Sequence, residues 1–121
     1  GKRVAVIYPW PEFSYSVPAH LARSALRGEN LTHLGMSRAA FDSQSSRIVT
    51  MLDRVVDGKR ILRADPARVL CRPSLCSEYA DGNVLYFDDD HLSASGARYL
   101  APGETQFRPA VRPAAPSVGR T

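Results

Sequence analysis

The sequence predicts an α/β domain of the doubly wound type, because patterns typical of strands and helices alternate along the chain. Residues 4–8 are continuously apolar and rich in β-branched side chains, which predicts a strand buried on both faces, as in a parallel sheet. Residues 38–56 repeat apolar side chains at helical spacing, and residues 60–64 follow as a second strand. This order of strand, helix and strand is typical of a parallel sheet flanked by helices.

The first predicted strand ends at the two prolines that follow it, since proline cannot donate a hydrogen bond to a sheet. Residues 10–16 are then expected to form a loop at the carboxyl end of that strand, where open α/β sheets place their sites. A short helix is predicted over residues 17–26, with Pro18 in its first turn and Gly28 stopping it.

The segment 30–37 fits no single pattern, because Gly35 interrupts it. A longer helix is predicted over residues 38–56, with Gly58 placed to cap its C-terminus. Its expected buried face consists of apolar residues at helical spacing with two more beside them: Phe41, Ile48, Leu52 and Val55, with Met51 and Val56.

The last predicted elements surround a cluster of acids. An Asp-Gly pair marks a turn, residues 84–87 form a short extended segment, and Ser93 can cap a final helix over residues 94–100. Beyond it, the chain carries four of its nine prolines and no leucine or isoleucine. Residues 101–121 are therefore expected to be a disordered, proline-rich tail.

The composition indicates one modest globular domain, with 44% apolar and 23% charged residues among 121. The net charge of +4 is spread along the chain without a Lys/Arg block or interleaved aromatic residues, which argues against a nucleic-acid partner. The longest apolar run, residues 4–8, is far shorter than the roughly 20 residues of a membrane span. The chain opens without Met, so we expect it to be cut from a longer protein.

Two cysteines, Cys71 and Cys76, follow the second predicted strand at a separation of five. They are either unpaired thiols or the ends of a small disulfide loop, which would contribute only about 2 kcal/mol. A disulfide would imply an oxidising compartment. A metal site is not expected here, because one cysteine pair without a second Cys/His pair supplies too few ligands.

The most informative motif is Asp88-x-x-His91, between the short extended segment and the last helix. A carboxylate placed in this way can accept the Nδ1 proton of the imidazole, which leaves Nε2 free to take a proton from a hydroxyl nucleophile. Asp88 and His91 are therefore candidates for two members of a catalytic triad. A metal site is the alternative, but adjacent residues of this run cannot all point at one ion, so Asp89 and Asp90 are expected to be solvated or to cap the turn.

Three other polar residues carry more ordinary expectations. Glu12 follows the first strand and is expected to be a loop carboxylate. His20 and His33 lie on helical or irregular stretches without acidic partners, so both are expected at the surface.

The block Tyr86–Ala97, with the sequence YFDDDHLSASGA, resembles the last block of the SGNH (GDSL-like) hydrolases. It is most similar to the version in SGNH domains fused to membrane acyltransferases that O-acetylate lipopolysaccharide or peptidoglycan. The strand ending in residues 8–12, the helix start at Val17 and the cysteine loop also lie where that subgroup has comparable pieces. The resemblance spans residues 3–100, and its one highly specific part is the Asp-x-x-His block.

The resemblance implies that His91 is the general base and Asp88 its orienting carboxylate in ester hydrolysis or acyl transfer to a sugar hydroxyl. In that family the nucleophilic serine belongs to a Gly-Asp-Ser motif, which does not occur in this sequence. The family's two later oxyanion-hole blocks, one built around a glycine and one with the pattern Gly-x-Asn-Asp, are absent as well. The four serines nearest to the predicted site have no context typical of a replacement nucleophile: Ser14, Ser16, Ser93 and Ser95.

The resemblance implies that residues 1–100 are the C-terminal half of a three-layer α/β/α SGNH domain of flavodoxin-like type. The expected parent is a periplasmic or extracytoplasmic, membrane-anchored protein, whose upstream acyltransferase domain acts with this domain on acylated cell-envelope carbohydrate. The chain alone is expected to be inactive, and no cofactor or metal is expected. The alternatives are a degenerate SGNH-like binding module and a part of a free secreted esterase.

Overall fold

The computed structural model describes residues 1–101, so the tail predicted over residues 101–121 lies, beyond its first residue, outside the described part. In chain order the elements are β1 (Val4–Ile7), α1 (Val17–Leu26), the 3-10 turn η1 (Leu31–His33), β2 (Gly35–Ser37), α2 (Arg38–Asp53), β3 (Ile61–Ala64), α3 (Ala67–Leu70), β4 (Leu75–Ser77), β5 (Tyr79–Ala80), β6 (Asn83–Val84) and α4 (Ala94–Leu100). This mixture of helices and small sheets is the predicted α/β class. No helix within residues 1–101 is both long enough and apolar enough to cross a membrane.

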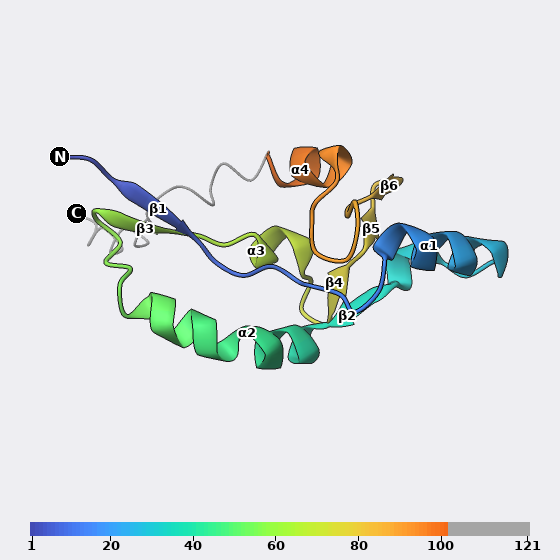
Figure 1. The fold of residues 1–121 in the computed structure, drawn as a ribbon, viewed down its shortest axis with the longest axis horizontal. Coiled ribbons are helices and arrows are strands. Elements are labelled where there is room, and N and C mark those ends of the chain that lie inside the picture. The colour runs from blue at the N-terminus through green and yellow to red at the C-terminus, as the bar shows by residue number, and fades with distance from the viewer. Residues whose placement is uncertain (102–121) are drawn as a thin grey trace, which may run out of the picture.

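The parallel pair expected from the sequence is present as β1 and β3. Val4 lies opposite Ile61 and Ile7 opposite Ala64, and the pair forms one end of the elongated fold (Figure 1). The other described strands form two small antiparallel sheets, β2 with β4 and β5 with β6, near α1 at the other end. The three-layer arrangement around a larger parallel sheet stays a prediction.

The first strand is more exposed than its apolar sequence predicts. Val4 and Ile7 are 57% and 58% exposed, whereas Tyr8, just past the strand, is buried. The backbone N–H groups of Val4 and Tyr8 donate to carbonyls beside and within β3. Since backbone groups alternate along a parallel strand, those of Ala5 and Ile7 point to the opposite edge, which no described strand covers. Burial on both faces was therefore the wrong expectation, because Val4 and Ile7 point to opposite faces of β1 and both are exposed among the described residues.

An apolar cavity of about 290 Å³ lies at the carboxyl ends of β1 and β3, beside α4. Strand, loop and helix residues line it: Ile7, Trp10, Ala64, Pro66, Leu92, Ala97, Leu100 and Ala101. Together with the uncovered edge of β1, this cavity leaves apolar surface open around the parallel pair.

Helix α2 begins where expected but ends earlier, at Asp53 instead of residue 56. Ser37 caps its N-terminus by accepting a hydrogen bond from the backbone N–H of Ala40 at 3.1 Å. Gly58 does not cap the helix. It has φ +71° in the turn before β3, where the Asp57 carboxylate accepts hydrogen bonds from the backbone N–H groups of Lys59, Arg60 and Ile61.

The predicted buried face of α2 is buried only near its start. Phe41 is 4% exposed, but Ile48, Met51 and Val55 are 48%, 60% and 50% exposed. The end of α2 is joined to the parallel pair by polar contacts of Asp53. The Tyr8 hydroxyl donates to Asp53 at 2.6 Å, and Arg63 reaches the same carboxylate at 3.2 Å.

The main hydrophobic core lies away from the parallel pair, around the segment that leads into the Asp-x-x-His motif. Its buried members come from the loop after β1, from α1, from α3 and from residues 85–86: Phe13, Val17, Leu21, Leu70, Leu85 and Tyr86. The rings of Phe13 and Tyr86 meet edge to face, with centroids 5.1 Å apart. This core therefore packs the loop after β1 against the segment that leads into the Asp-x-x-His motif.

Ser93 caps helix α4, as predicted, and the helix is held close to the core. The Ser93 hydroxyl accepts a hydrogen bond from the N–H of Gly96 at 2.9 Å and donates one to the carbonyl of Val84 at 2.6 Å. Gly96 packs directly on the backbone of Leu85, so a Cβ atom at this position would lie 2.0 Å from the Leu85 carbonyl oxygen. Only glycine allows this approach of helix to chain.

We expect Gly96→Ala to lower the free energy of unfolding by about 1–3 kcal/mol, because overpacking against a rigid backbone forces the helix away. Helix propensity alone would favour alanine by about 1 kcal/mol, so the sign of the change distinguishes the two effects. The urea midpoint of the variant measures it, with Arg98→Ala on the exposed side of the same helix as control. An unchanged or raised midpoint would refute the close approach.

Candidate active site

The side chains of Asp88 and His91 meet in the loop between β6 and α4. Nδ1 of His91 lies 2.9 Å from Oδ2 and 3.2 Å from Oδ1 of Asp88. The carboxylate is itself held by the backbone, because its Oδ1 accepts hydrogen bonds from the N–H groups of Asp90 at 3.0 Å and His91 at 2.7 Å. With Nδ1 occupied in this way, the Nε2 side of the imidazole is the side left to a reacting group.

The same contacts determine the charges of the pair. The two backbone donors, reinforced by the His91 side chain, lower the pKa of Asp88 to about 2, so this carboxylate is ionised at neutral pH. The hydrogen bond to Asp88 and the negative charges of Asp88 and Asp90 raise the pKa of His91 above its ordinary value. The His91 side chain is 72% exposed and open to an external substrate.

Asp90 contributes more to the pair than a solvated loop residue. Its Oδ1 lies 2.7 Å from Nδ1 of His91, so two carboxylates share one imidazole nitrogen. The donor atoms of Asp88, Asp90 and His91 lie within 4.8 Å of one another, and Asp89 is not part of this group. The convergence is centred on Nδ1, where it fixes the orientation of the ring.

The loop after β1 holds the motif in place. The indole N–H of Trp10 donates to the Asp90 carbonyl at 2.8 Å, and the N–H of Phe13 donates to the Asp89 carbonyl at 2.8 Å. The N–H of Val17, at the start of α1, donates to the Asp88 carbonyl at 3.2 Å. Three consecutive carbonyls of the site loop are thus bound by one segment, residues 10–17, which the sequence placed next to the site.

No serine of residues 1–101 is hydrogen-bonded to His91. Ser93 lies closest in sequence, but its hydroxyl is already engaged by the Val84 carbonyl and the Gly96 N–H. The described residues therefore contain an oriented imidazole and its carboxylate, with no serine hydroxyl hydrogen-bonded to the ring.

His20 has an acidic partner, contrary to the expectation from sequence. Its Nδ1 lies 2.8 Å from Oε2 of Glu78, a residue that is completely buried between β4 and β5. The partners are 58 residues apart, so no local pattern pointed to them. His33 and Glu12 are exposed, as expected.

The two cysteines are joined by a disulfide in the structure. Cys71 and Cys76 are both buried and pack with Phe41 and Ala67 in a second, smaller apolar cluster. The disulfide ties the end of α3 to β4, which leads towards Glu78 and the site loop.

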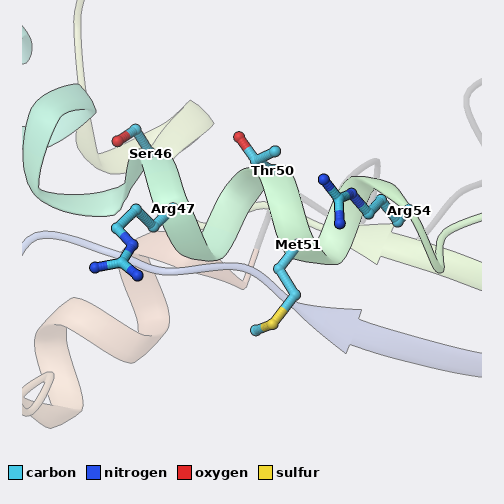
Figure 2. A pocket seen from close by; sticks show the side chains of 5 residues that line it. All are labelled: Ser46, Arg47, Thr50, Met51 and Arg54. Atoms are coloured by element: carbon cyan, nitrogen blue, oxygen red, sulfur yellow. The ribbon is translucent and has the colours of Figure 1, made fainter.

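A larger hollow, of about 430 Å³, lies along α2 and is separate from the motif. It is lined by Ser46, Arg47, Thr50, Met51 and Arg54 (Figure 2). Figure 2 shows Ser46 and Thr50 on one side of the helix and Arg47 and Met51 on the other, so these groups do not converge on a common point. The chemistry that converges is at Asp88 and His91.

We expect the ring protons of His91 to titrate in NMR spectra with a midpoint above 6.5, because Asp88 and Asp90 stabilise the imidazolium. Asp88→Asn should lower this midpoint, and Asp90→Asn should lower it less, since Asp88 is the larger cause. His33, on η1, serves as the spectator ring in the same spectra. An equal His91 titration midpoint in the wild type and in Asp88→Asn would show that the pair is not formed in solution.

Comparison with known proteins gives one match. The family model described as the SGNH domain fused to AT3 domains matches residues 1–103. No curated protein and no solved structure matches the chain significantly. The matched region contains the parallel pair, the disulfide and the Asp88–His91 pair, and it points broadly to acyl-ester chemistry. The chain belongs to the family of SGNH domains that are fused to AT3 domains.

Proposed function

We propose that this chain supplies the base and the orienting carboxylate of a Ser-His-Asp triad that acts on acyl esters. The observation that carries the proposal is the contact of His91 Nδ1 with Asp88 at 2.9 Å, on an imidazole that is 72% exposed. The reaction is O-acyl transfer to, or ester hydrolysis on, a cell-envelope polysaccharide such as lipopolysaccharide or peptidoglycan.

In the proposed reaction His91 Nε2 takes the proton of a serine hydroxyl while the serine oxygen attacks the ester carbonyl. The imidazolium formed in this step is stabilised by the ionised Asp88 and by Asp90. Collapse of the tetrahedral intermediate expels the alcohol, which receives the proton from His91, and leaves an acyl-serine. A sugar hydroxyl or water then gives its proton to His91 Nε2 and attacks the acyl group, and the serine leaves with the proton returned from His91.

The serine and the oxyanion-hole groups come from a second segment of the parent protein. The support for this step is the uncovered edge of β1 and the open apolar cavity at its carboxyl end. A strand added beside β1 would end next to residues 10–17, the segment that carries the site loop. The parent is a membrane-anchored protein with its acyltransferase domain in cis, and the Cys71–Cys76 disulfide fits an oxidising, periplasmic or extracytoplasmic location.

The purified chain alone should hydrolyse p-nitrophenyl acetate no faster than the same concentration of free imidazole, because His91 has no nucleophile to activate. His91→Ala should remove any imidazole-type background from this residue. Turnover above that level that is abolished by His91→Ala would mean that the chain holds its own nucleophile, against the proposal.

In the complete parent protein, His91→Ala should lower the rate of acyl transfer or hydrolysis about 10³-fold or more, and Asp88→Asn about 10⁴-fold at most. The rate should rise with pH until His91 is neutral, and its raised pKa places that rise above the ordinary range of histidine. Pseudo-first-order rates of the wild type and both variants measure the losses, and a pH–rate profile of the wild type and Asp88→Asn measures the shift of the pH dependence. Full activity of His91→Ala would favour a degenerate module whose chemistry resides elsewhere.

A further inference from the structure

A fully buried carboxylate, Glu78, lies behind the candidate active site and is bound by two side chains. The Tyr15 hydroxyl donates to its Oε1, and His20 Nδ1 lies 2.8 Å from its Oε2. The rings of Tyr15 and His20 also contact each other, with centroids 4.6 Å apart. A buried carboxylate is tolerated only when its oxygens are hydrogen-bonded, so each of these two partners compensates one oxygen.

These partners lie on either side of the start of α1, in the same part of the chain that holds the site loop. Phe13 and Val17, whose N–H groups bind the carbonyls of Asp89 and Asp88, are each two residues from Tyr15. Phe13 also packs against the Tyr15 ring, with centroids 5.5 Å apart. Glu78 therefore binds side chains of residues 13–20, and backbone N–H groups of the same segment bind the Asp88–Asp90 loop.

The backbone of Glu78 is anchored independently. Its N–H donates to the Leu34 carbonyl at 3.3 Å, and its carbonyl accepts from the N–H of Leu85 at 3.0 Å. Leu85 in turn accepts from the N–H of Ser93 through its own carbonyl, at the start of α4. Glu78 is thus attached by its backbone to the chain before the motif and by its side chain to the segment that binds the motif.

We propose that Glu78 is a positioning residue for His91. Through Tyr15 and His20 it holds the N–H groups of Phe13 and Val17 where they fix the Asp88–Asp90 loop, and it thereby keeps the imidazole on its carboxylates. The contribution of this role to catalysis rests on the proposed function of His91. The positioning itself does not, because it concerns only the geometry of the loop.

The test compares Glu78→Ala with Glu78→Gln in the whole chain by NMR. Glu78→Ala removes both acceptors, so amide exchange at Phe13 and Val17 should become about tenfold faster or more, and the titration midpoint of His91 should fall towards that of Asp88→Asn. Glu78→Gln keeps the shape and an oxygen that can accept from Tyr15, so it should restore part of both effects.

Glu29→Ala is the matched control, because Glu29 is an exposed carboxylate near His20 and Ser24 that is not bound to Tyr15. It should leave Phe13, Val17 and His91 unchanged. The Gly96 amide, bonded to Ser93, reports whether a variant has loosened the whole fold.

Uniformly faster exchange at Phe13, Val17 and Gly96, with an unchanged His91 titration, would overturn the proposal and leave Glu78 a general stabilising residue. If Glu78→Ala does not fold, Tyr15→Phe removes one of the two contacts and should produce the same local pattern to a smaller extent; its failure to do so would count equally against the proposal. A positioned His91 without any ester chemistry in the parent would contradict the proposed function alone.

Discussion

The site depends on one set of contacts, in which residues 10–17 bind three consecutive carbonyls of the Asp88–Asp90 loop. A loop that carries three aspartates and an exposed histidine has little apolar surface of its own to bury. It is ordered because residues 10–17 bind its carbonyls and because the Asp88 carboxylate accepts hydrogen bonds from the N–H groups of Asp90 and His91. The orientation of His91 is therefore a property of two loops that are far apart in the sequence.

Two carboxylates of opposite exposure support this arrangement. Asp88 is partly exposed and is held by backbone N–H groups, which keeps it ionised beside the imidazole. Glu78 is inaccessible to solvent and relies on the side chains of Tyr15 and His20. Asp88 contacts His91 directly, whereas Glu78 contacts the segment that holds the site loop. The loss of either carboxylate would therefore change the orientation of the His91 ring.

Much of the local structure could be predicted from the sequence because its signals are local. Pro18 at the first turn of α1 and Ser93 before α4 each mark a helix start that the sequence predicts. The Asp88–His91 contact was predictable for the same reason, since three residues separate the partners. What local patterns could not give was long-range contact, above all the pairing of Glu78 with His20.

The exposed apolar residues show a second limit. The periodicity of α2 and the composition of β1 predict buried surfaces, but a sequence pattern does not say which segment covers them. Val4, Ile7, Ile48 and Met51 are exposed in residues 1–101 because the described chain provides no cover for these surfaces. An apolar pattern therefore predicts which side chains can be buried, and the surrounding structure decides which of them are.

The span of the Trp10–Asp90 hydrogen bond, 80 residues, also bears on the order of events during folding. Contacts between distant parts of a chain form late, because the loop between them must close first. During synthesis, α1 and α2 can form while the site loop has not yet been made, since the amino-terminal part is translated first. His91 would consequently acquire its orientation in one of the last steps, after the scaffold around it is complete.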